Sequence, residues 1–161
     1  MDMDGDFGVA EQDKEEVDMD NITKFHLRKP AAEVFEALMD PAHMANYWFS
    51  GTERLEAGRV VTWRYEEYGA EVAVRVLELE PDRRLVFQWG ADGGGHVVTI
   101  TLTALDAEQT VIAVCEAGFD ERAEGFALEL ADNKEGWVYM LTCLKAYVEF
   151  GINRLRASMV R

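Results

Sequence analysis

The spacing of hydrophobic residues changes along this chain, from alternation with polar residues in its middle part to helical spacing near its end. Alternation is clearest in His96–Leu105, where Val98, Ile100 and Leu102 share one face and three threonines share the other. This pattern predicts a strand with one covered face and one wet face. Similar runs, separated by turns rich in glycine, proline or aspartate, predict antiparallel neighbours. The predicted strands in this part are Glu53–Glu56, Arg59–Glu66, Ala70–Glu80, Arg83–Trp89, His96–Leu105 and Thr110–Ala117.

A further strand and two short helices are predicted before these runs. Ile22–Leu27 has the composition of a strand, and Pro30 follows it, which suits the first turn of a helix over Ala31–Met39. Asp40 and Pro41 then interrupt the helix. Because aspartate is a preferred N-cap residue and proline a preferred first helical residue, a second short helix is expected to begin there.

The last predicted element is a long amphipathic helix that runs almost to the C-terminus. Asp132, with Glu135 three residues later, forms a candidate capping box at its start. Arg154 and Arg156 suit the negative end of its dipole. One apolar stripe at helical spacing is expected to cover the sheet. Its members are Trp137, Met140, Leu141, Leu144, Tyr147, Val148, Ile152 and Leu155.

Several separated motifs resemble one known family. They are Asp40-Pro41 through Trp48-Phe49, Glu56-Ala57-Gly58, Val76-Leu77-Glu78, Pro81-Asp82-Arg83-Arg84-Leu85-Val86-Phe87-Gln88-Trp89, Gly118-Phe119 and Gly136-Trp137. With them, residues 21–155 resemble the activator of heat-shock protein 90 ATPase homologues of the START-like, SRPBCC superfamily. The resemblance implies an α+β helix-grip (START-like, Bet v-like) fold, in which a curved antiparallel β-sheet wraps around a long C-terminal α-helix and two short helices follow strand 1.

The resemblance also implies a cavity between sheet and helix, which in relatives binds apolar small molecules or serves a partner interaction. It does not imply an enzyme. The eukaryotic activators add a separate N-terminal domain that contacts the chaperone. Residues 1–20 are too short and too acidic to supply such a domain, so chaperone activation by this chain is not expected.

Charge is spread unevenly over the 161 residues. The formal net charge is −15, and residues 1–20 hold nine acidic residues against one lysine, a net charge of −8. Such a segment repels itself and has little to bury, so a disordered tail is expected over 1–20, followed by a single domain over 21–161. The acidic excess argues against nucleic acid as a partner.

Other classes of site have little support in the sequence. No stretch approaches the roughly 18 consecutive apolar residues that span a bilayer, and no signal peptide is recognisable, so no membrane partner and a cytoplasmic location are predicted. Cys115 and Cys143 lack CxxC spacing, and His26, His43 and His96 lie far apart without a metal-ligand motif. Neither a metal nor a cofactor is therefore predicted.

Glu116 is the polar site candidate, because strand alternation places it on the face of Ile112 and Val114, toward the helix. A carboxylate there is either partly desolvated and able to orient a ligand, or solvated at the end of its strand. Gly118 and Gly136 are interpreted as turn or close-approach positions. The remaining candidates are large apolar side chains, which fill the core or line the cavity. They are Trp48, Trp63, Phe87, Trp89, Trp137, Met140, Leu141, Leu144 and Tyr147.

The sequence favours a non-catalytic protein that binds a small hydrophobic or aromatic molecule between sheet and helix. Two alternatives stay open: a polyketide cyclase or hydrolase, and a protein-interaction module, for a co-chaperone or stress-response role, with a packed interior. A cavity containing Glu116 and a second ionisable group would favour catalysis, apolar walls would favour binding, and no cavity would favour the interaction module. Both a monomer and a homodimer are compatible with the pattern.

Overall fold

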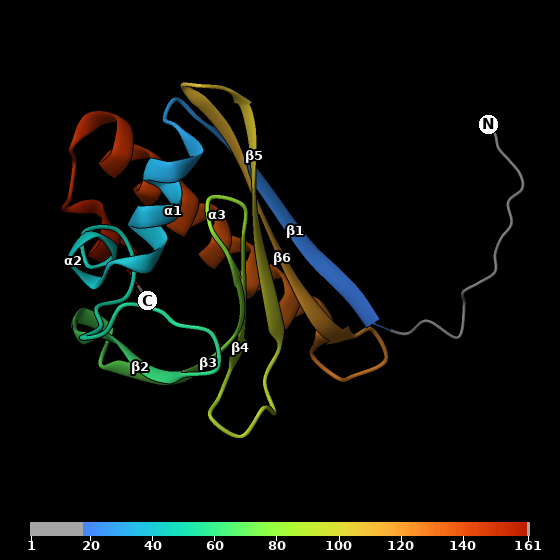
Figure 1. The fold of residues 1–161 in the computed structure, drawn as a ribbon. Helices are drawn as coiled ribbons and strands as arrows, with labels where there is room; N and C mark the ends of the chain where they lie inside the picture. The colour runs from blue at the N-terminus through green and yellow to red at the C-terminus, as the bar shows by residue number, and fades with distance from the viewer. Residues whose placement is uncertain (1–17, 161) are drawn as a thin grey trace, which may run out of the picture.

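The computed structural model describes residues 18–160 of the chain, and residues 1–17 and 161 lie outside the described part (Figure 1). One antiparallel sheet has the strand order β1-β6-β5-β4-β3-β2. Figure 1 shows the helices gathered on one side of this sheet. The helix-grip architecture expected from the sequence is thereby confirmed. The strands are β1 (Asp18–Leu27), β2 (Val60–Tyr65), β3 (Ala70–Glu80), β4 (Arg84–Trp89), β5 (Val97–Asp106) and β6 (Gln109–Asp120).

Two short helices, α1 (Ala31–Met39) and α2 (Pro41–Met44), follow β1 as predicted. The side chain of Asp40 accepts a hydrogen bond from the backbone N–H of Ala42 at 2.9 Å, so Asp40 is the N-cap of α2. A long helix, α3 (Phe126–Phe150), follows the sheet, and two short 3-10 turns, η2 (Glu66–Tyr68) and η3 (Leu155–Ala157), complete the elements.

The core lies between the concave face of the sheet and the helices. Val98 and Ile100 of β5 are fully buried and Leu102 is 5% exposed, which confirms the alternation predicted for this strand. Leu141 and Leu144 of α3 are also fully buried. Each such side chain contributes about 1.5–3 kcal/mol when it leaves water, so the buried stripe of α3 is a major stabiliser of the fold.

Strand β1 begins earlier than the sequence predicted. It starts at Asp18 instead of Ile22, and β6 continues to Asp120, with Asp18 paired to Asp120. The two extensions occur together because each strand supplies the backbone partners of the other. Residues 18–20, which were predicted to belong to the tail, are therefore part of β1, and residues 1–17 lie outside the described residues.

The strand predicted over Glu53–Glu56 is wrong, because this segment forms no strand. Its charged side chains instead bind neighbours on the surface: Arg54 pairs with Glu36 at 2.7 Å and Arg59 with Glu53 at 3.2 Å. The segment links α2 to β2 as a loop.

The limits predicted for the C-terminal helix are also wrong at both ends. The helix begins at Phe126, so Asp132 and Gly136 lie within it and Asp132 is not the N-cap. It ends at Phe150 because Gly151 adopts the left-handed conformation, with φ +70°, that commonly terminates helices. Residues 152–156 therefore leave the helix and do not extend its apolar stripe. Along residues 18–160, no helix combines the length and the apolar character needed to cross a membrane.

Candidate functional site

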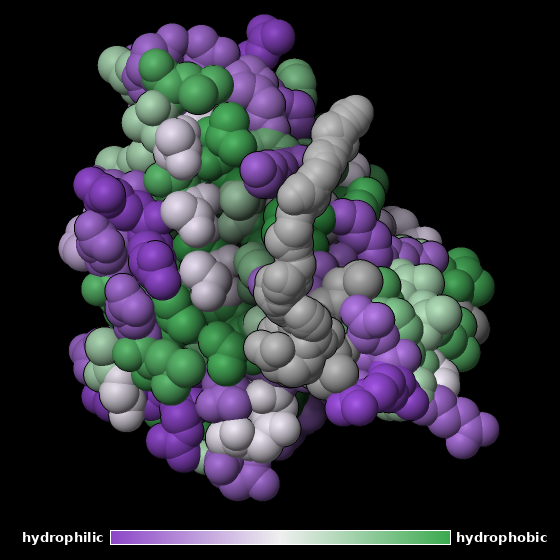
Figure 2. All heavy atoms as spheres, turned by 90° about the vertical axis from the view of Figure 1, so that its right-hand side faces the viewer, coloured by the Kyte–Doolittle hydropathy of each residue, from purple (hydrophilic) through white to green (hydrophobic). Residues whose placement is uncertain are grey.

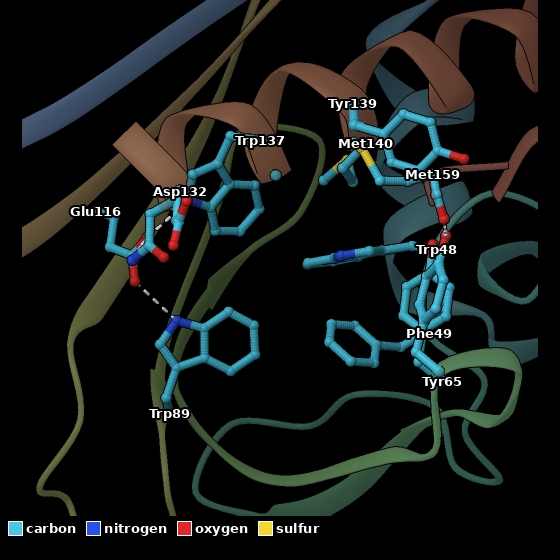
Figure 3. A pocket seen from close by; sticks show the side chains of 13 residues that line it. Trp48, Phe49, Tyr65, Trp89, Glu116, Asp132, Trp137, Tyr139, Met140 and Met159 are labelled. Atoms are coloured by element: carbon cyan, nitrogen blue, oxygen red, sulfur yellow. Dashed lines mark hydrogen bonds between the residues drawn. The ribbon is translucent and has the colours of Figure 1, made fainter. Parts of the chain in front are cut away.

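A pocket of about 290 Å³ opens between the sheet, α3 and the C-terminal segment (Figure 3). Trp48 and Phe49, which follow α2, form one wall, and Trp89 at the end of β4 lies opposite. Trp137 and Met140 of α3 form the roof. The other lining residues are Tyr65, Tyr68, Glu116, Asp132, Asn133, Gly136, Tyr139 and Met159.

Five of the ten residues proposed from the sequence line this pocket: Trp48, Trp89, Glu116, Trp137 and Met140. The other five do not line it. Trp63 and Phe87 are fully buried behind the wall, with the Trp63 ring 4.9 Å from that of Trp48 and the Phe87 ring 5.3 Å from that of Trp63. They support the wall without lining it.

Leu141 and Leu144 are fully buried core residues. Tyr147 lines a different cavity, of about 400 Å³, together with His43. The hydroxyl of Tyr147 and Nδ1 of His43 are hydrogen-bonded at 2.7 Å. Within the described residues, therefore, the pocket near Glu116 does not include the C-terminal half of the predicted stripe.

Four aromatic rings form a closed circuit around the pocket. The ring centroids of Trp48 and Phe49 are 5.4 Å apart, those of Phe49 and Trp89 are 6.0 Å apart, those of Trp89 and Trp137 are 6.4 Å apart, and those of Trp137 and Trp48 are 5.6 Å apart. Consecutive rings are tilted by 31–57°. Tilted contacts at these distances add stability beyond simple burial. The circuit is therefore a stable wall, built from three separate parts of the chain.

Glu116 lies at one end of the pocket and is 2% exposed. Its Oε1 accepts hydrogen bonds from the indole N–H of Trp137 at 2.7 Å and from the Asn133 amide at 3.3 Å. Its Oε2 accepts one from the indole N–H of Trp89 at 3.0 Å and lies 3.2 Å from Nδ1 of His96. A carboxylate can be buried when its oxygens receive this many donors. The alternative of a solvated side chain is wrong, and the inward orientation is confirmed.

His96 connects Glu116 to the surface. Nε2 of His96 lies 3.7 Å from the carboxylate of Glu129 on α3, and the imidazole packs against Phe119 with 4.3 Å between the ring centroids. Gly118, in β6, makes room for this ring. Its φ is +104°, and a Cβ atom there would lie 3.3 Å from Cδ2 of His96. The close-approach interpretation is therefore confirmed at Gly118.

The same interpretation is wrong at Gly136. This residue lies within α3, and a Cβ atom added there would meet nothing within 4 Å. No turn or backbone contact requires glycine at this position. Because Gly136 lines the pocket, the missing side chain leaves space there.

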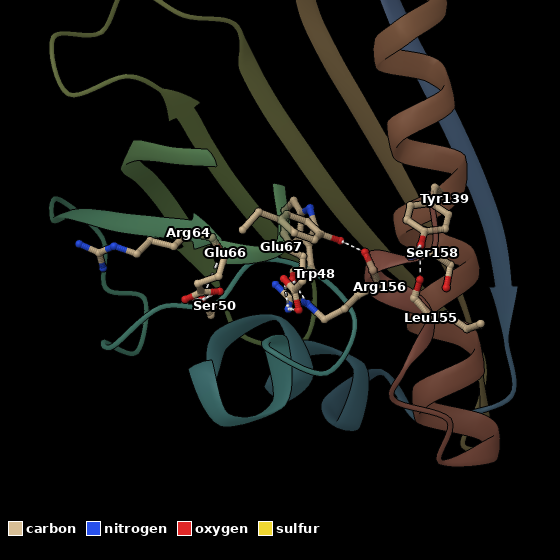
Figure 4. Close-up of polar contacts among 10 residues, drawn as sticks. Trp48, Ser50, Arg64, Glu66, Glu67, Tyr139, Leu155, Arg156 and Ser158 are labelled. Carbon is tan, nitrogen blue, oxygen red and sulfur yellow. Dashed lines mark hydrogen bonds and ion pairs between the residues drawn. The ribbon is translucent and has the colours of Figure 1, made fainter. Parts of the chain in front are cut away.

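The C-terminal segment reaches the pocket through Met159, and Figure 4 shows polar contacts that hold this segment in place. Arg156 is 8% exposed, donates from Nε to the carbonyl of Trp48 at 2.6 Å, and pairs with Glu67 at 2.7 Å. The hydroxyl of Tyr65 donates to the carbonyl of Arg156 at 2.6 Å, and that of Tyr68 to the carbonyl of Met159 at 2.9 Å. These bonds hold Met159 at the pocket.

The guanidinium of Arg156 lies 4.5 Å from the centre of the Tyr65 ring. Burial raises the pKa of the Tyr65 hydroxyl, even though the Arg156 charge opposes this rise. The hydroxyl therefore remains a hydrogen-bond donor over the physiological pH range. Tyr139 reinforces the segment by donating its hydroxyl to the carbonyl of Leu155.

The remaining lining residues were not identified from the sequence, although a signal exists for some of them. Asn133 and Gly136 each lie four residues before a predicted member of the stripe, Trp137 and Met140, so helical spacing places them on the same face. Tyr65 lies two residues after Trp63 and so shares its face of β2. Met159 carries no such signal, because only the reversal after Gly151 brings it to the pocket.

The sequence matches the family model described as Activator of Hsp90 ATPase homolog 1-like protein over residues 28–149. The crystal structure of the protein SSP2350 from Staphylococcus saprophyticus is 40% identical, with a TM-score of 0.73. That match covers 84% of this chain and 95% of the other. No curated protein matches the chain.

Two other solved structures are also similar. DynU16, a putative protein in the dynemicin biosynthetic locus, is 27% identical with a TM-score of 0.72, and the match covers 83% of this chain and 48% of DynU16. The Aha1 dimer from Colwellia psychrerythraea is 17% identical with a TM-score of 0.70, covering 83% of this chain and 98% of the other. At that identity the second similarity concerns the fold alone.

Proposed function

This chain belongs to the Activator of Hsp90 ATPase homolog 1-like protein family, and from that premise we propose that it binds a small hydrophobic or aromatic molecule without converting it. The observation that carries this proposal is the circuit of Trp48, Phe49, Trp89 and Trp137 around an open pocket between sheet and helix. Pockets for small molecules are concave, mostly apolar and equipped with few polar groups, and this pocket has those properties.

The hydrogen bonds of Glu116 favour binding over catalysis. A general acid or base must exchange a proton with its substrate, and it needs a free oxygen within hydrogen-bond reach. Both oxygens of Glu116 already accept bonds from Trp89, Trp137 and Asn133. The carboxylate therefore acts in this proposal as a positioning group that fixes the two indole rings.

An enzyme of the cyclase or hydrolase kind is the second candidate. Asp132 is exposed and lines the mouth of the pocket, so it is a second ionisable group near Glu116. A role as general base predicts that Asp132→Asn abolishes turnover of a bound substrate while leaving its binding intact.

The open pocket weighs against the third alternative, a protein-interaction module with a packed interior. We also propose that the protein is located in the cytoplasm and that it is a monomer or a homodimer.

Gly136 offers a test that leaves the fold in place. We expect Gly136→Leu to fill the pocket, because its side chain would begin in open space at the lining of the pocket. Leucine favours helices more than glycine by roughly 0.5–1 kcal/mol, so the melting temperature should stay equal or rise. Native mass spectrometry of the purified protein should find a small molecule retained by the wild type and lost from Gly136→Leu.

Gly136→Ala is the matched control, since it changes the helix in the same direction but adds only a methyl group. It should retain the ligand. If the wild type retains no molecule and neutral aromatic compounds do not quench its tryptophan fluorescence, the proposed function is wrong.

A further inference from the structure

We infer that the pocket takes a small organic cation, namely an amine or quaternary ammonium that carries apolar groups, and this inference rests on the proposed binding function. It is drawn from three features: the arrangement of the aromatic rings, the charges that line the pocket, and the size of the pocket.

The circuit of four rings has dimensions that suit a cation. With consecutive centroids 5.4–6.4 Å apart, the point at the centre of the four lies within about 6 Å of every ring. A cation over the face of an aromatic ring is attracted to it within about this distance, most strongly to tryptophan. Trp48, Trp89 and Trp137 supply three of the four rings. A charge at the centre would be close to all of them at once.

The charged residues at the pocket are all acidic. Thirteen residues line it, and none is lysine, arginine or histidine, whereas Glu116 and Asp132 both contribute carboxylates. Two indole N–H groups and one amide point to the oxygens of Glu116. Carboxylate oxygens accept such hydrogen bonds. Glu116 therefore presents a carboxylate at the end of the pocket, with Nδ1 of His96 at 3.2 Å from its Oε2, and Asp132 presents a second carboxylate at the mouth.

The nearest arginine does not place a positive charge inside the pocket. The guanidinium of Arg156 is bound to Glu67 and to the carbonyl of Trp48, and it does not line the pocket. Instead it lies over the Tyr65 ring at 4.5 Å, so the protein already places one cation against an aromatic ring beside the pocket. His96, which contacts Glu116 at 3.2 Å, also lies outside the lining, so an anionic ligand would meet two carboxylates and no basic side chain at the pocket surface.

The size of the pocket limits the ligand. A volume of about 290 Å³ lies at the lower end of the range for small-molecule sites. It suits a compound with one ring or a short branched chain beside its charged nitrogen. A quaternary ammonium, one of the two proposed kinds of cation, has no N–H donor and therefore requires no hydrogen bond from the protein.

A matched pair of probes tests the inference on the intact protein. Phenyltrimethylammonium and tert-butylbenzene have the same shape and differ by one positive charge. Titrations followed by tryptophan fluorescence should show the cation binding about tenfold tighter, as expected from several cation–π contacts and nearby carboxylates. Asp132→Asn should weaken binding of the cation roughly threefold and leave binding of the neutral probe unchanged, because it removes one charge at the mouth.

Glu135→Gln is the control, since it removes the same charge from an exposed position on α3 that does not line the pocket. It should alter neither affinity. Equal binding of the two probes, or tighter binding of tert-butylbenzene, overturns the inference but leaves the proposed function standing. If neither the wild type nor Gly136→Leu binds either probe, both the inference and the proposed function are overturned.

Discussion

Gly118 has a φ of +104° in strand β6, a conformation that residues with a Cβ atom rarely adopt, and the His96 ring lies directly beside it. His96 in turn contacts Glu116, which orients Trp89 and Trp137. A single glycine in a strand thereby leaves room for the histidine that contacts the polar end of the pocket. Its neighbour in the family motif, Phe119, is fully buried against the same histidine.

A side chain at Gly118 is expected to destabilise the fold. Gly118→Ala should lower the free energy of unfolding by about 1–3 kcal/mol, because alanine is strained at positive φ and its Cβ would press on His96. Urea unfolding measures the change. Gly136→Ala is the comparison, and it should be neutral or raise stability by up to about 1 kcal/mol. Equal losses for both variants would contradict the distinction between the two glycines.

At the scale of elements, the end of α3 is tied to the end of β1. The carboxylate of Glu149, 6% exposed, accepts bonds from the backbone N–H of Arg28 at 2.8 Å and from Lys145 at 2.6 Å. Lys145 also donates to the carbonyl of His26 at 2.8 Å. Burial raises the pKa of Glu149, but the bonds from Lys145 and Arg28 together outweigh it and leave the pKa below its ordinary value.

This shift predicts how stability changes with pH. A carboxyl whose pKa is lowered on folding stabilises the fold fully above its unfolded pKa, and this contribution is lost as pH falls through the folded pKa. Glu149→Gln should therefore lower the free energy of unfolding by about 1 kcal/mol at pH 7. The difference from wild type should shrink as the pH falls below 4.5, the ordinary value. Denaturation with urea at several pH values measures it. Exposed Glu135→Gln is the control, and a loss for Glu149→Gln that does not vary with pH would contradict the assignment.

At the scale of the whole molecule, negative charge and exposed apolar side chains share the surface. The formal charge is −15, and Figure 2, a view from the side of Figure 1 on which β1 lies, shows hydrophobic and hydrophilic residues both reaching the surface. Ile22 of β1, for example, is 50% exposed. We propose from composition that residues 1–17, with seven acidic residues and one lysine, form a solvated tail.

Two deletions test this proposal. Removing residues 1–17 should shift the melting temperature by no more than about 2 °C, because a solvated tail contributes few contacts. Removing residues 1–21 should lower it clearly, since that deletion takes away paired residues of β1 and the bond from the Asn21 amide to the carbonyl of Leu130 at 3.1 Å. A large drop for the shorter deletion would contradict the proposal.

Apart from the strand over Glu53–Glu56, the sequence alone was enough to predict the order of the main elements and the inward faces of the strands. Val98, Ile100 and Glu116 were placed correctly because side chains in a strand alternate between its two faces, a rule that depends on local geometry alone. The tertiary structure decided which of the buried residues line a pocket. Trp63 and Phe87 follow the same alternation as their neighbours, yet they lie behind the wall, because Trp48 and Phe49 from a distant loop lie in front of them.

The end of the chain shows the same division. Helical spacing continues through Ile152 and Leu155 in the sequence, but a left-handed Gly151 turns the backbone and brings Arg156 and Met159 back to β2 and η2. The contacts that hold this reversal, such as Arg156 with Glu67, join residues far apart in the chain. The spacing of residues along a sequence predicts which face of a single helix or strand is buried. A pocket, in contrast, forms where several elements pack together, and their packing is known only from the folded chain.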